Sequence, residues 1–560
     1  MTAPAAAASI WLALATSIEL FLDASDAARF CARGWWRDET VIDDLRAAAA
    51  RRPDRAAIVA HRDGATHAIA YAELLTLTDR FAGGLLELGV QPGDIVTIEM
   101  PNWWQLPVLY LACARIRAVV NPVQPIMRSR ELGFILERTA SRVCIVPDTW
   151  RGFSYAGMLA QLTERVPTLE HCVVIGDASI PRGVEFDRHF TQARWEDRHP
   201  AGELDRLAPA ADDVAQVMFT SGTTGEPKGA IHTHNTLFAA MRCEPHALGL
   251  SGDDVVHMGS PMTHQAGFLY CHFMPVHLGG TAVFQDVWDA GVMLDLVESR
   301  GITFAMGATP FVLDAIAAQR ARPRDVESLR LFVCGGTSIP SHLVREAAEV
   351  LGAELVALWG MTENGGVTLT SAGDPPELVA DSDGRTVPWM EARIVDDQGR
   401  PCEGRRVGRL LVRGASQCLG YFKRPDLYAA SLDPDGWFDT GDLARSDGHG
   451  GIRIAGRSKD LIIRGGENVP VAEVESLLYL HSKVREVAVV AYPDERLGER
   501  ACAVVAPEGE APALPELQRH LEARGMARSF WPERLEIVDE LPKTPSGKIQ
   551  KFVLRQRLLG

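Results

Sequence analysis

The sequence predicts an α/β protein with more than one domain, and three observations support this. Short apolar runs alternate with segments of helical periodicity from residue 36 to about residue 380, a pattern typical of mainly parallel sheets. The chain has 560 residues, too many for one hydrophobic core. Beyond residue 380, closely spaced Asp-Gly pairs and then a compact α+β section change the pattern.

The first part of the chain shows strand–helix alternation. A helix, a Pro-Asp turn and a strand are predicted over 40–61, and a buried helix over 106–120. The apolar runs predict strands at 94–100, 142–148, 171–177, 214–219, 255–261, 281–286, 302–307, 329–336 and 354–360. Further helices are predicted over 292–300 and 342–351. This order favours a large α/β domain.

Two smaller sections follow. DSDGR, DDQGR, DPDGW and SDGHGG separate short strands such as 391–396 and 408–414, which predicts antiparallel hairpins in a small barrel-like unit. After GRSKD (456–460) the chain reads strand, helix, strand, strand, helix, strand at 461–465, 471–480, 486–492, 501–507, 514–524 and 533–540. This length suits a small α+β domain.

Composition excludes several classes of protein. The net charge of −16 argues against a nucleic-acid binder and against adhesion to anionic membranes. Ten cysteines without a CxxC pair indicate reduced thiols in a cytoplasmic enzyme and argue against zinc. The apolar run from Ile10 to Leu22 lacks a preceding basic residue and is short for a membrane span, so we expect an amphipathic or extended N-terminus and no stable membrane insertion.

The stretch TSGTTGEPKG (220–229) has the chemistry of a phosphate-binding loop. It is not a Walker A loop, because Pro227 stands where Gly is needed and Gly229 where Ser or Thr is needed. Its glycines let backbone N–H groups converge on an anion, and Lys228 adds a positive charge. The alternative is a polar surface hairpin.

Several other stretches occur in a fixed order with this loop: WGMTE (359–363), TGD (440–442), GRSKD (456–460) and PKTPSGKIQK (542–551). With them the chain resembles the adenylate-forming superfamily, which includes acyl-CoA synthetases, luciferases and peptide-synthetase adenylation domains. HQAGF, GATPFVLDAI and VCGGTSIP are most similar to short- and medium-chain acyl-CoA synthetases and the cyclohexanecarboxylate-CoA ligase subgroup. The resemblance covers residue 36 to the end and implies two α/β sheets plus a small β-barrel in a large domain (36–458), a mobile small α+β domain (459–560) and an N-terminal extension (1–35).

The resemblance implies a two-step reaction. A carboxylate attacks the α-phosphate of ATP to form an acyl-adenylate, and a thiol, here coenzyme A, then takes the acyl group. The first step joins two anions, so the site must supply positive charge. The implied ATP-phosphate ligands are Thr220, Ser221, Gly222, Thr223, Thr224, Gly225 and Lys228, with Thr362 at the α-phosphate and Glu363 and Thr223 at Mg²⁺. Glu363 could instead cap the following turn.

The nucleoside end is implied to contact a second set of residues. Asp442 and Arg457 would bind the ribose, and the adenine would lie between Trp359 and the residues Gly335, Gly336 and Thr337, beside Gly360. An Asx turn and a solvated arginine are the alternatives for Asp442 and Arg457. The family usually has Tyr at position 359, so Trp359 is expected to keep the stacking and lose one hydrogen bond.

The C-terminal motif supplies the implied catalytic lysine, Lys548, which would bridge the carboxylate and the α-phosphate. After adenylation the small domain is implied to rotate about Lys459. Lys548 then leaves, and Gly465 and Gly466 approach the pantetheine. In isolation, Lys548 could equally be a solvated lysine on a loop.

The acid pocket is the least specified part. His264 is expected near the carboxylate, and Phe268, Thr309, Pro310 and Phe311 are candidate walls, with Gly307 leaving room. No charged residue is placed to read a second polar group, which favours an aliphatic, alicyclic or simple aromatic acid. Loading of a carrier protein, a luciferase-like oxygenase and a non-enzymatic binder are alternatives, and a homodimer is left open.

Overall fold

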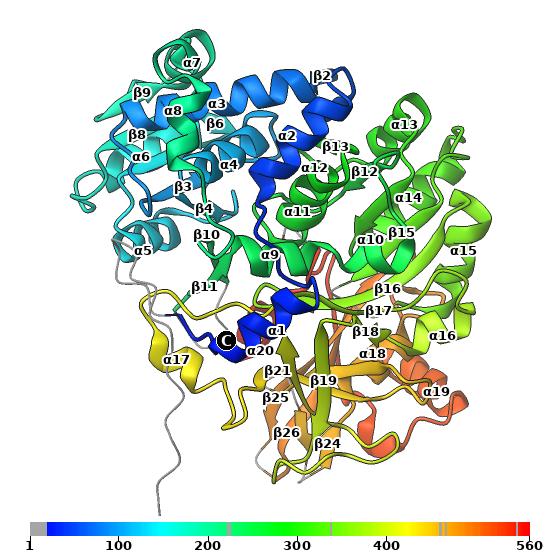
Figure 1. Ribbon diagram of the computed structural model, residues 1–560. Coiled ribbons are helices and arrows are strands. Elements are labelled where there is room, and N and C mark those ends of the chain that lie inside the picture. The colour runs from blue at the N-terminus through cyan, green and yellow to red at the C-terminus, as the bar shows by residue number, and fades with distance from the viewer. Residues whose placement is uncertain are drawn as a thin grey trace, which may run out of the picture. The chain divides into compact units, whose positions relative to one another are not determined.

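The structure is a computed structural model that describes residues 20–177, 179–220, 226–335, 339–458, 462–464, 467–494, 496–544 and 547–559 (Figure 1). The chain divides into two compact units. Unit 1 comprises Met1–Ala305, Gly360–Val367 and Gly414–Ala430; unit 2 comprises Met306–Trp359, Thr368–Arg413 and Ser431–Gly560. The expectation for the apolar run at the N-terminus falls mostly on residues outside the described ranges. No described helix is long and apolar enough to span a bilayer.

Unit 1 contains a seven-stranded sheet in the order β11-β10-β4-β3-β5-β8-β9. Its pairings are parallel except for the antiparallel β10–β11 hairpin. The strands are β3 (Ile95–Glu99), β4 (Val119–Val123), β5 (Val143–Pro147), β8 (His171–Ile175), β9 (Gly183–Glu185), β10 (Val214–Thr220) and β11 (Lys228–Thr233). β10 is parallel to β4, so Thr220, at the carboxyl end of β10, lies at the sheet edge where α/β proteins bind ligands.

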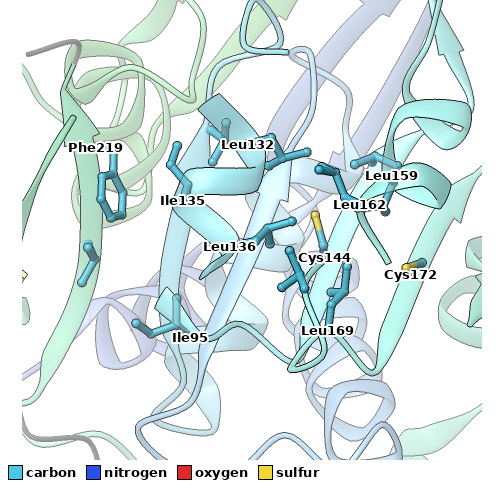
Figure 2. Close-up of a cluster of buried hydrophobic side chains, with 14 of the residues drawn as sticks. Ile95, Leu132, Ile135, Leu136, Cys144, Leu159, Leu162, Leu169, Cys172 and Phe219 are labelled. Atoms are coloured by element: carbon cyan, nitrogen blue, oxygen red, sulfur yellow. The ribbon is translucent and has the colours of Figure 1, made fainter. Parts of the chain in front are cut away.

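Helices pack on this sheet because its parallel strands are apolar on both faces and both faces must be covered. They include α3 (Tyr71–Glu87), α4 (Gln105–Arg115), α5 (Ser129–Thr139) and α6 (Tyr155–Leu162). Figure 2 shows part of the hydrophobic core between these helices and the sheet, in which leucines of α5 and α6 lie near Cys144 of β5 and Cys172 of β8.

The helix predicted over 106–120 is shorter than expected. α4 ends at Arg115, and β4 begins at Val119. Arg117 adopts a positive φ of 60° between them, which ends the helix and turns the chain into the strand. The apolar residues on both sides of this turn gave a continuous pattern, so periodicity could not mark the boundary.

A second group of strands in unit 1 contains β1, β2, β12 and β13. β1 (Ala56–Arg62) pairs in parallel with β13 (Thr281–Gln285) and antiparallel with β2 (Ala65–Ala70), and β12 (Val255–Met258) is parallel to β13. The other described α-helices of unit 1 are α1 (Ala24–Ala32), α2 (Val41–Arg51), α7 (Trp195–Arg198), α8 (Ala201–Leu204), α9 (His234–Met241), α10 (Cys243–Leu248), α11 (Gln265–Phe268), α12 (Met274–Leu278), α13 (Ala290–Arg300) and α17 (Pro425–Ala429).

Unit 2 combines parallel strands with an antiparallel sheet and, near the C-terminus, a mixed sheet. β15 (Leu331–Gly335) is parallel to β16 (Glu354–Met361), with α14 (Thr309–Ala321) packed on α15 (Ser341–Leu351). The Asp-Gly region forms a four-stranded sheet in the order β19 (Met390–Val395), β20 (Gly408–Gly414), β21 (Phe438–Ser446) and β22 (Ile452–Arg457). The predicted antiparallel hairpins are confirmed here.

The C-terminal section of unit 2 has the predicted α+β composition. Its sheet has the order β24-β23-β26-β25, with β27 beside β26. The elements are β23 (Ile462–Arg464), β24 (Glu467–Val469), α18 (Val471–Leu478), β25 (Val484–Asp494), β26 (Gly498–Pro507), α19 (Leu514–Ala523), β27 (Arg534–Ile537) and α20 (Lys551–Leu559). A separate buried cluster, including Val474, Val489 and Leu517, forms its core.

Candidate functional site

The glycine-rich loop joins β10 to β11 in unit 1. Thr220, the last residue of β10, is paired with Lys228, the first of β11. The Thr220 hydroxyl also donates to the Lys228 carbonyl over 3.4 Å. Ser221, Gly222, Thr223, Thr224 and Gly225 lie outside the described residues. The structure therefore fixes the two ends of the predicted phosphate loop, and it puts its lysine at the start of a buried strand.

The predicted metal-binding motif lies directly after a strand, as expected. β16 ends at Met361, and Thr362 and Glu363 follow. His232 of β11 donates from Nε2 to the Thr362 carbonyl, 2.9 Å away, while its Nδ1 lies 3.1 Å from the Thr236 hydroxyl. Burial lowers the pKa of His232 to about 4, although the bond to Thr362 acts in the opposite direction. A neutral histidine therefore anchors the backbone at Thr362.

A tyrosine that sequence reasoning missed connects the predicted metal ligand with the predicted phosphate lysine. The hydroxyl of Tyr421 donates to Glu363 Oε1 over 2.8 Å, and the Lys228 ammonium lies 5.1 Å from the centre of the Tyr421 ring. Both Glu363 and Tyr421 are buried. Burial, followed by the nearby Glu363 charge, raises the pKa of Tyr421, so its hydroxyl remains a donor at neutral pH.

The predicted acid-pocket residues of unit 1 lie in and beside a short helix. His264 is the N-cap of α11, where its Nδ1 accepts from the Ala266 N–H over 3.3 Å. Phe268 ends α11 and is fully buried, with ring centroids 4.9 Å from Tyr110 and 4.8 Å from Phe273. His264 thus has a capping function, and Phe268 belongs to an aromatic cluster.

Unit 2 brings together three predicted nucleoside-binding residues. The buried carboxylate of Asp442 accepts from Trp359 Nε1 at Oδ2 over 2.9 Å, and its Oδ1 pairs with Arg457 Nε at 3.0 Å. Asp442 and Arg457 are cross-strand neighbours on β21 and β22. Trp359 lacks the hydroxyl of tyrosine, and its indole N–H makes a hydrogen bond to Asp442.

Two other predicted adenine-site residues, Gly335 and Gly360, lie in neighbouring parallel strands. Gly335 ends β15, opposite Leu358 of β16. A Cβ at Gly335 would stand 2.8 Å from the Leu358 carbonyl oxygen, so only glycine fits without movement of the backbone. Gly360 lies within β16. Gly336 and Thr337 lie outside the described residues.

The loop carrying Lys548 lies close to predicted acid-pocket residues of the same unit. Lys548 is half-buried, and Gly547 before it has a φ of +81°. A Cβ on Gly547 would stand 3.2 Å from Ala308 Cβ and 3.5 Å from Phe311 Cε2. Thr309 is buried at the start of α14, with its hydroxyl 3.6 Å from Cys334 Sγ.

Some predictions fall outside the described residues. Besides the residues already named, these are the hinge Lys459 and the two glycines Gly465 and Gly466. In the described part of the chain, no group of three His, Cys, Asp or Glu side chains could hold a metal ion. A lone carboxylate such as Glu363 suits Mg²⁺, because Mg²⁺ usually takes one or two carboxylates and completes its shell with substrate phosphates and water.

The sequence as a whole matches one enzyme family. The AMP-binding enzyme family matches residues 45–422, and the AMP-binding enzyme C-terminal domain matches residues 473–548. The chain belongs to the AMP-binding enzyme family. The adenylate-forming resemblance carried by the motifs is therefore confirmed.

Relatives of this AMP-binding enzyme cover nearly its whole length. The medium-chain fatty-acid–CoA ligase of Escherichia coli K12 is 33% identical over 546 residues, covering 95% of this chain and 93% of the relative. The salicyl-AMP ligase / salicyl-S-ArCP synthetase of Mycobacterium tuberculosis H37Rv is 34% identical over 541 residues, covering 96% and 94%. The crystal structure of ATP-bound MatB from Rhodopseudomonas palustris superposes with a TM-score of 0.80 at 26% identity, covering 93% and 99% of the two chains.

These comparisons define the AMP-binding enzyme at a coarse level. It is an ATP-dependent, AMP-forming ligase of the acyl- and aryl-CoA ligase type. The relatives differ in the acid that their names give, and one of them is named for a carrier-protein product.

The buried His232 leads to a pH-dependent prediction for this AMP-binding enzyme. Its pKa is depressed in the folded chain, so its contribution to stability is present above the unfolded value near 6.5 and is lost as the pH falls toward 4. His232→Gln keeps a donor for the Thr362 carbonyl and removes this titration. We expect the destabilisation of the variant relative to wild type to shrink by about 2 kcal/mol between pH 7.5 and pH 5.

Urea unfolding of both proteins at the two pH values measures this difference. Comparing the variant with wild type cancels the contributions of all other titrating groups. A difference in the free energy of unfolding that stays constant with pH would contradict the assignment of His232 as neutral in the folded chain.

Proposed function

We propose that the protein is an ATP-dependent acyl-CoA synthetase acting in the cytoplasm. It activates a short- or medium-chain, alicyclic or simple aromatic carboxylic acid as the acyl-adenylate and transfers the acyl group to coenzyme A. The observation that carries the proposal is the cluster in which Tyr421 links Glu363 to Lys228. It combines a carboxylate for a metal with a cation for phosphates beside the loop predicted to bind them. All ten cysteines are free, which suits a reducing compartment.

Different residues are assigned to different parts of the adenylation step. Lys228 and the loop after Thr220 hold the β- and γ-phosphates, and Thr362 donates to the α-phosphate. Glu363 ligates Mg²⁺, which when bound neutralises phosphate charge and orients the triphosphate. Lys548 neutralises the approaching carboxylate and the α-phosphate in the transition state.

The nucleoside end is assigned to the unit 2 cluster. Asp442 accepts from the ribose hydroxyls while Trp359 and Arg457 hold its carboxylate in place. The adenine stacks on Trp359. By the motifs, Phe268, Thr309 and Phe311, all buried, are assigned to the acid, and His264 is assigned to its carboxylate.

Transfer to the thiol needs a different arrangement of the chain. We assign the residues before Lys459 to a large domain and the residues from Lys459 to the end to a small one that rotates about this hinge. The loop around Gly465 and Gly466 then takes the place of Lys548 and contacts the pantetheine.

A second acceptor has specific support. The Mycobacterium tuberculosis relative is named as a salicyl-S-ArCP synthetase, and a carrier protein presents the same pantetheine thiol as coenzyme A. The alternative is therefore a stand-alone enzyme that loads a carrier protein.

The first experiment is an AMP-release assay with ATP, Mg²⁺ and coenzyme A. The acids are propionate, butyrate, hexanoate, octanoate, decanoate, cyclohexanecarboxylate, benzoate and salicylate, with mass detection of each acyl-CoA. Coenzyme-A-dependent turnover to an acyl-CoA would establish the synthetase and define its acid. Pyrophosphate release with any of these acids but no acyl-CoA would favour the carrier protein as acceptor, whereas no exchange of pyrophosphate with any acid would oppose both.

The indole of Trp359 should affect nucleotide recognition through Asp442. Trp359→Phe keeps an aromatic face for the adenine and removes the hydrogen bond to Asp442. We expect KM for ATP to rise by about 5- to 10-fold, because bonds to charged groups contribute about 1.5–3 kcal/mol and Arg457 remains. Steady-state kinetics with ATP and 2′-deoxy-ATP provide the test, since discrimination between them should shrink.

Trp437→Phe is the matched control, because the Trp437 ring lies in the same unit and contacts Arg393 and Arg413. Unchanged discrimination in Trp359→Phe, or an equal loss in the control, would oppose a role for the indole N–H.

A further inference from the structure

A short segment of unit 1, residues 418–422, lies between the two parts of the proposed phosphate and metal site. Its backbone pairs with β11: Ile231 N–H donates to the Gly420 carbonyl over 3.0 Å, and Phe422 N–H donates to the Gly229 carbonyl over 2.7 Å. At its start, Cys418 N–H donates to the Glu363 carbonyl over 2.6 Å. The segment therefore holds the strand of Lys228 and the turn of Glu363 in a fixed relation through its backbone.

Tyr421 repeats this connection with its side chain. The ring lies beside the Lys228 ammonium, and the hydroxyl reaches the Glu363 carboxylate. The Tyr428 ring also packs edge-on against the Tyr421 ring, with 5.5 Å between the ring centroids and an interplanar angle of 85°. Only 4% of Tyr421 is exposed, so water does not compete freely for its hydroxyl.

We propose that Tyr421 is a positioning residue for the metal–nucleotide complex. Its hydroxyl holds the Glu363 carboxylate in the orientation that binds the divalent cation, and its ring holds the Lys228 ammonium toward the phosphates. The inference rests on the proposed function, because it takes Glu363 as the metal ligand and Lys228 as the phosphate ligand.

The two interactions of Tyr421 can be separated by substitution. Tyr421→Phe keeps the ring and its contact with Lys228 but removes the bond to Glu363. Tyr421→Leu removes both. We expect Tyr421→Phe to weaken binding of the divalent cation by about tenfold, the usual effect of losing a bond to a charged group. Metal-free binding of the nucleotide should stay unchanged in Tyr421→Phe and weaken by about 2- to 5-fold in Tyr421→Leu, as expected from loss of a cation–π contact.

The probe is Mn²⁺ with α,β-methylene-ATP, which does not react. Electron paramagnetic resonance measures free Mn²⁺ in a titration of the full chain, and calorimetry without metal measures the analogue alone. Both readouts are independent of catalysis. Thermal unfolding of each variant shows that the chain is folded under the conditions of the titration.

Two further variants make the test specific. Glu363→Gln removes the proposed ligand, and the effect of Tyr421→Phe on Mn²⁺ binding should fall below about twofold in that background, because the two residues act as one unit. Tyr428→Phe is the matched control: it removes a buried hydroxyl from the same aromatic pair, one that donates to the Cys418 carbonyl and accepts from Gln417 Nε2.

The outcomes separate this inference from the proposed function. If the wild-type chain binds neither the analogue nor Mn²⁺ with it, the proposed nucleotide site is wrong. If the wild-type chain binds both and Tyr421→Phe binds Mn²⁺ equally well, the positioning role is wrong. A loss in Tyr428→Phe as large as in Tyr421→Phe would also overturn it, because loosening of the segment would then explain the effect. Loss in Tyr421→Phe alone, abolished by Glu363→Gln, supports the inference.

Discussion

Replacing Lys548 by alanine should slow formation of the acyl-adenylate by about 10²- to 10³-fold, the range found when one group that stabilises a charged transition state is removed. Adenylation brings a carboxylate against a phosphate, and Lys548 is the cation assigned to that step. Thiolation of a supplied acyl-adenylate should remain within about twofold of wild type, because its chemistry develops no such pair of anions.

The loop around Lys548 should survive this substitution. Its backbone is closed by its own hydrogen bonds: Thr544 N–H donates to the Lys548 carbonyl over 2.8 Å, and Lys548 N–H donates to the Thr544 hydroxyl over 3.1 Å. Gly547 N–H also donates to the Thr544 carbonyl over 2.9 Å. None of these bonds uses the ammonium group, so the substitution leaves them in place.

Pyrophosphate exchange measures the first step, and single-turnover formation of acyl-CoA from a synthetic acyl-adenylate measures the second. Lys551→Ala is the matched control, because Lys551 lies three residues away and pairs with Glu475 at 2.7 Å. Equal slowing of both steps in Lys548→Ala would mean that the two steps do not use different arrangements of the chain.

Replacing Asp442 by asparagine should raise KM for ATP by about 10- to 100-fold, since bonds to a buried carboxylate contribute about 1.5–3 kcal/mol each. Asp442 is 5% exposed; its Oδ2 accepts a hydrogen bond from Trp359 Nε1, and its Oδ1 is ion-paired with Arg457 Nε. An asparagine amide would present its own N–H₂ to one of these donors, so the variant should also lose the preference for ATP over 2′-deoxy-ATP.

Asp439→Asn is the control for this prediction. Asp439 lies on the same strand, and it pairs with Arg409 at 2.7 Å. Initial-rate kinetics with ATP and with 2′-deoxy-ATP, at saturating acid and coenzyme A, measure both KM for ATP and the preference between the nucleotides. If Asp442→Asn left KM for ATP and the preference unchanged, the ribose would be bound elsewhere.

Most secondary-structure elements could be predicted from sequence because each has a local cause. Apolar runs such as 143–147 form strands buried on both faces, and the Asp-Gly pairs mark the hairpins of β19 to β22. The boundary between α4 and β4 could not be predicted, because it depends on a positive φ at Arg117, a residue without the usual preference for that conformation.

The candidate site was predicted only where motifs carry it. Glu363 and Lys228 stand in recognisable stretches, whereas Tyr421 is 58 residues from Glu363 and no spacing links them. Likewise, the indole N–H of Trp359 donates to Asp442, which is 83 residues away in the sequence. The effect of tryptophan in place of the family's usual tyrosine could therefore be judged only from the folded chain. Long-range hydrogen bonds of this kind leave no periodic signal.

The space around Gly547, where an added Cβ would meet Ala308 and Phe311, has a consequence for attempts to change the acid that the enzyme uses. Phe311 is a natural position to enlarge or reshape for a new substrate, and Gly307 already gives its ring the room that a Cβ, 2.7 Å from Phe311 Cδ2, would take. A bulkier residue at 311 would press on the glycine beside Lys548 and not only on the acid. If Phe311 lines the acid site as proposed, we expect substitutions at 311 to change selectivity and turnover together, and libraries that vary position 311 should vary position 308 with it.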